Sequence, residues 1–262
     1  MSSETLDRSL VLDAVRVTEA AAIAAWGLVG RGDEKAADQA AVDAMRNALN
    51  ELAIDGEIVI GEGERDEAPM LYIGEKVGAG KGPGIDIALD PLEGTTLTAK
   101  AMANALAVMA WAPKGTLLNA PDTYMDKIAC GPGYPAGILD LDKTPAENVQ
   151  ALADAKGTTP DQITVCVLDR PRHAEIMASL RSVGARVALI SDGDVAGVIN
   201  TADPETGIDL YIGRITDTDL DNIIFSYIHS YLQHSHIRYR HHLGANIKTI
   251  TGHSFSLFYF KG

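Results

Sequence analysis

From about residue 143 onward, short apolar runs alternate with helical patterns, and this alternation limits the chain to a small set of folds. Strands are expected at 163–168, 187–190 and 208–212, and helices at about 145–155, 172–183 and shortly after Asp194. Alternation of this kind is typical of a layered α/β fold with a partly parallel sheet. We therefore predict the α/β class for this part of the chain.

The first third of the chain predicts two helices followed by strands. The helices are expected over about 4–28 and 34–52, and the second carries an apolar stripe at three- and four-residue steps, made by Val42, Met45, Leu49 and Leu52. The period then changes to short runs bounded by Gly or Asp, which predicts strands at 57–61, 70–74, 85–90 and 105–111. No internal repeat is visible.

The net charge restricts the possible partners. The 262 residues carry a formal charge of −14, which repels nucleic acid and anionic lipid, so we expect neither as a partner. The same charge repels a phosphorylated metabolite unless bound cations reverse the local field. Cys130 and Cys166 lie far apart without metal-ligand spacing and are expected to be buried, reduced thiols. With no secretion signal and no apolar run of about 20 residues, we expect a cytoplasmic protein, with homo-oligomerisation left open.

One short segment carries the strongest chemical signal. An apolar strand from Ile85 runs into Asp90, and we expect a proline-fixed turn to follow, leading to Glu93, Gly94 and two threonines. Asp90 and Glu93 can then point into one small volume. Gly94 allows the backbone to approach a ligand closely, and its amide and that of Thr95 can meet a phosphate oxygen.

Two further acidic features each have an ordinary alternative. Asp38 precedes Val42, Met45 and Leu49 at helical spacing, which places it on the inward face, unless the helix begins later and Asp38 is exposed or capping. The segment 61–69 follows a strand and is either a solvated turn or a cation site. It holds four carboxylates in six positions, namely Glu62, Glu64, Asp66 and Glu67.

Hard oxygen ligands of this kind favour Mg²⁺ or Mn²⁺ over zinc. Phosphate monoesters hydrolyse extremely slowly in water, and two divalent ions can neutralise the phosphate, activate a water and stabilise the leaving group. An acidic protein with clustered carboxylates can therefore bind a phosphate through such ions.

Asp-Pro-Leu-Glu-Gly-Thr at 90–95 resembles the metal-binding motif of the lithium-sensitive phosphatases. Longer stretches resemble the class II fructose-1,6-bisphosphatases, and the likeness is collinear from about residue 5 to Gly213. These stretches are 30–38, 58–72, 119–125, 170–173 and 191–195. The resemblance implies a layered α/β/α/β/α sugar-phosphatase fold, here incomplete at the C-terminus.

The resemblance also implies residue roles. Asp38 and Glu62 hold one Mn²⁺ or Mg²⁺ ion, and Asp90 and Glu93 hold the second. Glu93, Gly94 and Thr95 line the phosphate, with Thr95 orienting the attacking water and Asp66 assisting. The remaining contacts to the sugar bisphosphate are implied for Tyr124, Arg170, Pro171, Arg172, Asp192, Gly193 and Asp194, while His173 is expected to be structural.

The likeness ends after Gly213. Where the family continues with a glycine-rich turn that supplies another metal ligand, this chain reads Arg214-Ile-Thr216. Asp221 is the last acidic residue, and the segment beyond it holds four bases and six of the seven histidines, so its composition differs from the rest. We therefore expect a metal-binding part over 1–135, a truncated α/β part over 136–221, and a basic, histidine-rich tail over 222–262 that does not match the family and packs poorly.

Three functions fit these observations. The first is metal-dependent hydrolysis of the 1-phosphate of fructose 1,6-bisphosphate to fructose 6-phosphate, with sedoheptulose 1,7-bisphosphate as a further substrate. The second is an inactive remnant that binds only metal or sugar phosphate, because a ligand loop is missing. A plain acidic ion-binding module is the third, and Tyr124, Arg170 and Arg172 argue against it.

Overall fold

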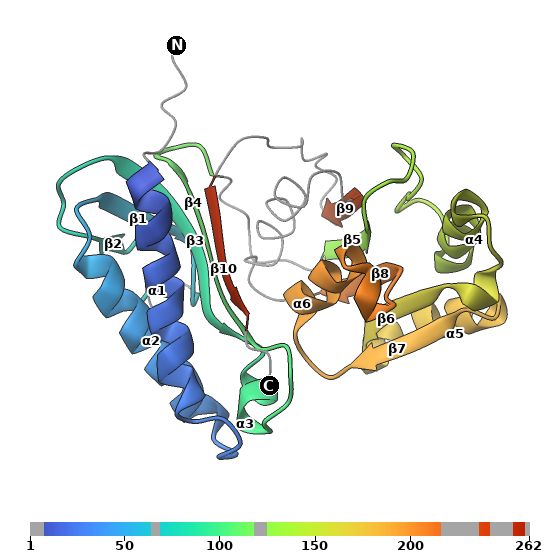
Figure 1. Cartoon of the computed structure of the whole chain (residues 1–262), viewed down its shortest axis with the longest axis horizontal. Helices are drawn as coiled ribbons and strands as arrows, with labels where there is room; N and C mark the ends of the chain where they lie inside the picture. The colour runs from blue at the N-terminus through green and yellow to red at the C-terminus, as the bar shows by residue number, and fades with distance from the viewer. Residues whose placement is uncertain (1–7, 64–68, 118–124, 216–235, 242–253, 260–262) are drawn as a thin grey trace, which may run out of the picture. The chain divides into compact units, whose positions relative to one another are not determined.

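The computed structural model describes residues 8–63, 69–117, 125–215, 236–241 and 254–259. They form two compact units (Figure 1). The first comprises the described residues up to 117 together with 254–259, and the second comprises 125–215 together with 236–241. The division therefore precedes the expected boundary at residue 135, because the strand at 125–130 pairs with strands of the second unit.

The first unit packs two helices against one mixed sheet. Its strand order is β10-β4-β3-β1-β2, with β1 (Asp55–Ile60) parallel to β3 (Gly84–Glu93) and the other pairs antiparallel. The remaining bounds are β2 (Lys76–Val77), β4 (Leu106–Pro113), β10 (Ser254–Tyr259), α1 (Arg8–Trp26), α2 (Glu34–Asn50) and the short α3 (Thr95–Ala99).

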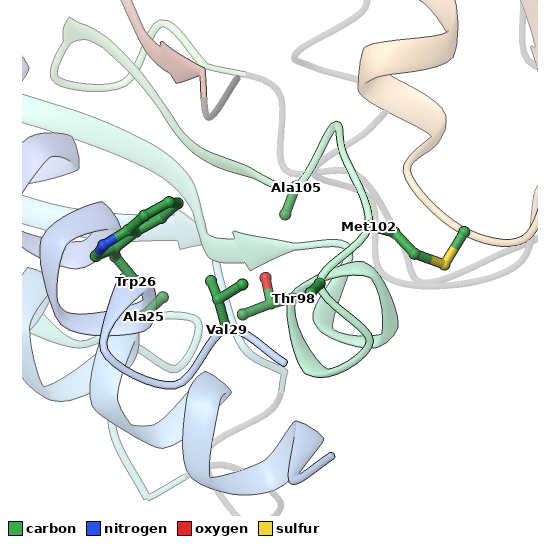
Figure 2. A pocket seen from close by; sticks show the side chains of 7 residues that line it. Ala25, Trp26, Val29, Thr98, Met102 and Ala105 are labelled. Atoms are coloured by element: carbon green, nitrogen blue, oxygen red, sulfur yellow. The ribbon is translucent and has the colours of Figure 1, made fainter. Parts of the chain in front are cut away.

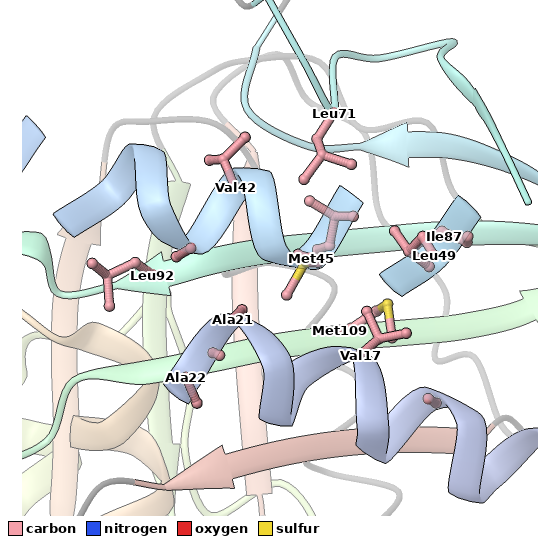
Figure 3. Close-up of a cluster of buried hydrophobic side chains, with 14 of the residues drawn as sticks. Val17, Ala21, Ala22, Val42, Met45, Leu49, Leu71, Ile87, Leu92 and Met109 are labelled. Atoms are coloured by element: carbon pink, nitrogen blue, oxygen red, sulfur yellow. The ribbon is translucent and has the colours of Figure 1, made fainter. Parts of the chain in front are cut away.

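The core of this unit lies between the two long helices and the sheet (Figure 3). Val42, Met45 and Leu49 form the buried stripe of α2 that the sequence predicts, and they pack with Val17 of α1 and Ile87 of β3. The helix begins where Asp33 accepts a hydrogen bond from the Ala36 amide at 3.0 Å. Both predicted helices are confirmed for the described residues.

The second unit has helices on both faces of its sheet. Alternate residues of one strand point to opposite faces, and Val165 and Val167 pack with α4 and α5, whereas Cys166 packs with Val198 of α6. The strand order is β7-β6-β8-β5-β9, with β6 parallel to β7 and β8. The bounds are β5 (Met125–Cys130), α4 (Pro145–Lys156), β6 (Thr164–Leu168), α5 (Ala174–Ser182), β7 (Arg186–Ile190), α6 (Asp194–Ile199), β8 (Leu210–Ile215) and β9 (His236–His241).

These elements confirm the α/β class and the predicted alternation after residue 143. They also place two parts of the expected tail in the sheets, since β9 pairs with β5 and β10 pairs with β4. Those two stretches are therefore strands of the two sheets. The rest of the tail, at 222–235, 242–253 and 260–262, lies outside the described residues.

The strand expected at 70–74 is wrong. Leu71 has a positive φ of 54°, which a strand does not allow, and the segment turns back on the residues that follow β1. The Glu62 amide donates to the Leu71 carbonyl at 3.1 Å, and the Ile73 amide donates to the Gly63 carbonyl at 3.0 Å. The apolar run 70–74 therefore forms a packed turn, because its backbone groups make hydrogen bonds with residues 62 and 63, which follow β1.

Gly61 and Gly74 offer a matched test of this turn. A Cβ at Gly61 would lie 2.0 Å from the Leu71 carbonyl oxygen, whereas one at Gly74 meets nothing within 4 Å and bears only the strain of its φ of +90°. We expect Gly61→Ala to lower the free energy of unfolding by roughly 2 kcal/mol or more and Gly74→Ala by about 1 kcal/mol. Chemical denaturation measures both, and equal losses would contradict the packed turn.

Candidate active site

Asp38 and Glu62 form the acidic pair that the structure brings together most clearly. Asp38 lies on α2 beyond its first turn, so it is not the helix cap, and it is partly buried. Burial raises the pKa of the Asp38 carboxyl above its ordinary value. Burial, and then the nearby Asp38 charge, raise the pKa of Glu62 to about 7. The two carboxyl groups are therefore close enough to oppose each other's ionisation.

Asp90 reaches the same edge of the sheet as Glu62. In the parallel pairing of β1 with β3, Ile60 lies opposite Ala88, so the residues two positions further along each strand are Glu62 and Asp90. Asp90 is partly buried, and its Oδ1 accepts a hydrogen bond from the Leu92 amide at 2.9 Å. The carboxyl ends of parallel strands are where ligands gather in α/β proteins.

The turn expected after Asp90 is instead an irregular continuation of β3. The strand runs to Glu93, which is buried, and its pairing with β4 shifts register between Asp90 and Glu93. A break in register suits the proline at 91, since proline has no amide proton for the ladder. Both acids thus lie on one strand, with the irregular stretch between them.

Gly94 ends this strand and begins α3 with a left-handed backbone, φ 89°. A side chain at this position would approach the Leu97 side chain to 2.9 Å, so both conformation and space favour glycine. Thr95 follows and is partly buried. The carbonyls of Thr98 and Ala99 accept hydrogen bonds, each 2.9 Å long, from the amides of Gly30 and Gly32, which fixes α3 beside the loop that leads into α2.

Two predicted residues, Asp66 and Tyr124, lie outside the described residues, as do Glu64 and Glu67. Within the part of the chain that the structure describes, no three or more Asp, Glu, His or Cys side chains form a group suited to a metal ion. Asp38 and Glu62 nevertheless fit a divalent cation, because a hard cation favours oxygen ligands and relieves the repulsion between two desolvated carboxylates.

The predicted sugar-contacting residues of the second unit have different surroundings. Arg172 is exposed in the short 3₁₀ turn that begins at Pro171, and Arg170 and Asp192 are partly buried. Gly193 has a left-handed backbone and precedes α6. Asp194 is buried and accepts a hydrogen bond from the Tyr211 hydroxyl at 2.9 Å, so in this structure it supports the core.

Three further sequence predictions concern buried side chains. His173 is fully buried, with Nδ1 2.8 Å from the Leu168 carbonyl oxygen, in agreement with a structural role. Cys130 and Cys166 are buried thiols, as expected. Burial, and then the Asp194 charge, raise the pKa of the Cys166 thiol to about 12, which keeps it protonated and unreactive.

A cavity of about 220 Å³ lies where the end of α1 faces α3 and the segment after it (Figure 2). Its lining is apolar apart from Thr98 and the indole of Trp26, and it contains none of the predicted site residues. Such a lining offers no charged group to a sugar phosphate, so we do not assign the active site to this cavity.

Glu75 is a buried acid that was not predicted from the sequence. Its side chain is buried, accepts a hydrogen bond from the Leu71 amide, and pairs with Arg46 of α2 through Nε at 2.6 Å. The available signal was a single acid at the end of the otherwise uncharged stretch 70–75, which lies close in sequence to the acidic segment 61–69.

The raised pKa of Glu62 makes stability depend on pH. Its pKa is about 7 in the folded chain, against 4.5 for an ordinary glutamate, so the folded chain binds more protons between these values. Protonated Glu62 therefore stabilises the folded chain fully below the unfolded-state pKa of 4.5. This contribution is lost as the pH rises through the folded-state pKa of about 7. Without divalent cations, we expect unfolding free energy to fall by roughly 2 to 3 kcal/mol between about pH 5 and about pH 8, and Glu62→Gln to remove most of that fall. Denaturation at several pH values measures it, and parallel profiles for the two proteins would contradict it.

Within the described ranges, every helix is too short or too polar to traverse a bilayer.

Comparison with known proteins identifies the family. The family model described as bacterial fructose-1,6-bisphosphatase, glpX-encoded, matches residues 8–215. Curated class 2 fructose-1,6-bisphosphatases of Escherichia coli (strain K12) and Shigella flexneri are each 52% identical over 206 residues. The match covers 79% of this chain and 61% of each relative, so the chain spans about three fifths of the length of the relatives.

A solved inositol monophosphatase from Anabaena (Nostoc) sp. PCC 7120 is 13% identical, with a TM-score of 0.37 over 74% of this chain and 71% of that one. The family model, in contrast, matches the larger part of the chain, from α1 to the end of β8. The chain therefore belongs to the bacterial, glpX-encoded fructose-1,6-bisphosphatase family.

Proposed function

We propose that this chain hydrolyses the 1-phosphate of fructose 1,6-bisphosphate with the help of divalent cations, giving fructose 6-phosphate and phosphate. The observation that carries the proposal is the 52% identity to curated class 2 fructose-1,6-bisphosphatases over 206 residues. All the carboxylates assigned from the sequence lie within the matched range 8–215. Sedoheptulose 1,7-bisphosphate is a second candidate substrate, since it presents the same phosphate ester.

The proposed ligands are Asp38 and Glu62 for one ion and Asp90 and Glu93 for a second, with Mn²⁺ or Mg²⁺ as the metal. Bound ions would neutralise the phosphate and make a water more acidic. The mutual repulsion of Asp38 and Glu62 and the shared sheet edge of Glu62 and Asp90 support this assignment. Neighbouring Thr95 orients the attacking water through its hydroxyl, and Asp66 assists as a proton acceptor.

The roles proposed in the second unit concern the rest of the substrate. Exposed Arg172, with Arg170, suits the phosphate that does not react, because a guanidinium matches phosphate oxygens in a forked geometry. Asp192 accepts hydrogen bonds from sugar hydroxyls, and Tyr124 contacts the sugar. We assign the protein to the cytoplasm, in keeping with its two buried thiols.

A second candidate function is that of a remnant which binds metal or sugar phosphate without turnover. The observation in its favour is the length, since the match covers 61% of the curated relatives and ends at residue 215. At the end of the match the chain reads Arg214-Ile-Thr216, where the family that the sequence resembles has a glycine-rich turn that supplies a metal ligand.

The substitution Asp90→Asn separates these candidates. In the presence of Mn²⁺, we expect the parent protein to release phosphate from fructose 1,6-bisphosphate and the variant to lose roughly a hundredfold or more in kcat/KM, because one metal ligand loses its charge. Asp43→Asn is the matched control, since Asp43 is an exposed residue of α2 whose carboxylate accepts a hydrogen bond from Gln39 one turn away, and it should leave the rate unchanged.

Two other outcomes would contradict the proposed activity or the proposed role of Asp90. Folded parent protein that releases no phosphate with Mn²⁺ or Mg²⁺, yet still binds Mn²⁺, would support the remnant. Normal turnover in Asp90→Asn would contradict the proposed role of that carboxylate.

A further inference from the structure

A partly buried ion pair, in which the carboxylate is the buried member, connects the helix that carries Asp38 to the turn that contacts Glu62. Glu75 is 5% exposed and has two partners on different elements. Its Oε1 lies 2.6 Å from Nε of Arg46 on α2, and its Oε2 accepts the hydrogen bond from the Leu71 amide. A buried carboxylate requires such partners. Here the two partners, Arg46 and Leu71, are 25 residues apart in sequence, so Glu75 connects two separate segments.

Leu71 is held in a conformation that its own backbone disfavours. Its φ of 54° costs about 1 to 2 kcal/mol for a residue with a side chain, so surrounding contacts must impose it. Two contacts do so. The side chain is fully buried in the core beside Val42 and Met45 of α2 (Figure 3), and the amide is held by Glu75.

The backbone of Leu71 in turn fixes the backbone of Glu62 through a hydrogen bond. The Leu71 carbonyl accepts a hydrogen bond of 3.1 Å from the Glu62 amide, and the Ile73 amide bonds the Gly63 carbonyl at 3.0 Å. Gly61 packs so closely against the Leu71 carbonyl that no side chain fits there. The backbone on both sides of Glu62 is thus fastened to the turn that Glu75 organises.

We propose that Glu75 is a positioning residue that, through Arg46 and Leu71, holds Glu62 against Asp38 and so preforms a cation-binding pair. This proposal rests on the proposed function for its metal, whereas the contacts of Glu75, Arg46 and Leu71 are made by the chain's own residues. Asp38 lies on α2 and the Glu62 amide is bonded to the Leu71 carbonyl, so an attachment of the turn to α2 also fixes the Glu62 backbone relative to the helix of Asp38. The Arg46–Glu75 pair supplies that attachment on the same helix as Asp38.

The decisive variant is Glu75→Gln, which keeps the shape of the side chain. A carboxylate accepts from both Leu71 and Arg46, whereas a glutamine must turn its amide nitrogen toward one of these two donors. Arg46→Met removes the other partner and leaves Glu75 in place, and Arg46→Lys keeps the charge and serves as the conservative variant. Glu57→Gln is the matched control, because Glu57 pairs with Lys76 on the neighbouring strands and takes no part in the turn.

Two measurements on the full chain decide the proposal. The first is hydrogen exchange of the Glu62 and Ile73 amides without metal. We expect exchange to accelerate roughly tenfold or more in Glu75→Gln and less in Arg46→Met, and to stay at the parent rate in Glu57→Gln. The second is the dissociation constant for Mn²⁺ alone, measured by titration, which should rise by about 10- to 100-fold in Glu75→Gln, with Arg46→Lys closer to the parent than Arg46→Met.

Unchanged exchange of the two amides in folded Glu75→Gln would overturn the proposal. So would faster exchange with unchanged Mn²⁺ affinity, because Glu75 would then support the turn without positioning a ligand. If Glu75→Gln does not fold, Arg46→Met and Arg46→Lys test the proposal by the same two measurements, amide exchange and Mn²⁺ affinity. If the parent chain binds no Mn²⁺, the proposed function fails, and the exchange measurement alone still decides whether Glu75 holds the loop.

Discussion

The parallel pairing of β1 with β3 is the constraint on which the site depends. Parallel strands end at the same edge of a sheet, so the residues that follow Ile60 and Ala88 reach one place although they are far apart in sequence. The two helices on the sheet bring Asp38 of α2 toward that edge. The acidic residues are therefore assembled by the core of the first unit, and Asp38, Asp90 and Glu93 each directly follow a buried apolar residue.

Gathering acids in this way opposes folding, because each partly buried carboxylate raises the free energy of ionising the next. Glu62 shows the consequence, with a pKa of about 7. The surrounding structure compensates with neutral and cationic donors, such as the Leu92 amide at Asp90 and Arg46 at Glu75. These donors anchor the backbone near the site without neutralising the Asp38–Glu62 pair itself, which remains suited to a divalent cation.

The sequence allowed most of the fold to be predicted wherever periodicity was strong. The stripe Val42-Met45-Leu49 and the alternation after residue 143 both reflect burial that repeats along an element, so they are visible without a structure. The turn at 70–74 was mistaken for a strand because its apolar residues are buried for a different reason, as a cover over the loop after β1. Glu75 was missed because its partners, Arg46 and Leu71, are brought together only by the tertiary fold.

The two units carry separable parts of the chemistry. The carboxylates from Asp38 to Glu93 lie in the first unit, whose strands β1 to β4 are contiguous between residues 55 and 113 and need no strand from the second. The residues assigned to the sugar lie in the second unit, where the family match ends with β8, a central strand between β6 and β5. The candidate carboxylates therefore depend on the packing of the first unit alone. The proposed metal binding can consequently be measured separately from the proposed turnover, because the residues proposed for the metal and those proposed for the sugar lie on different units.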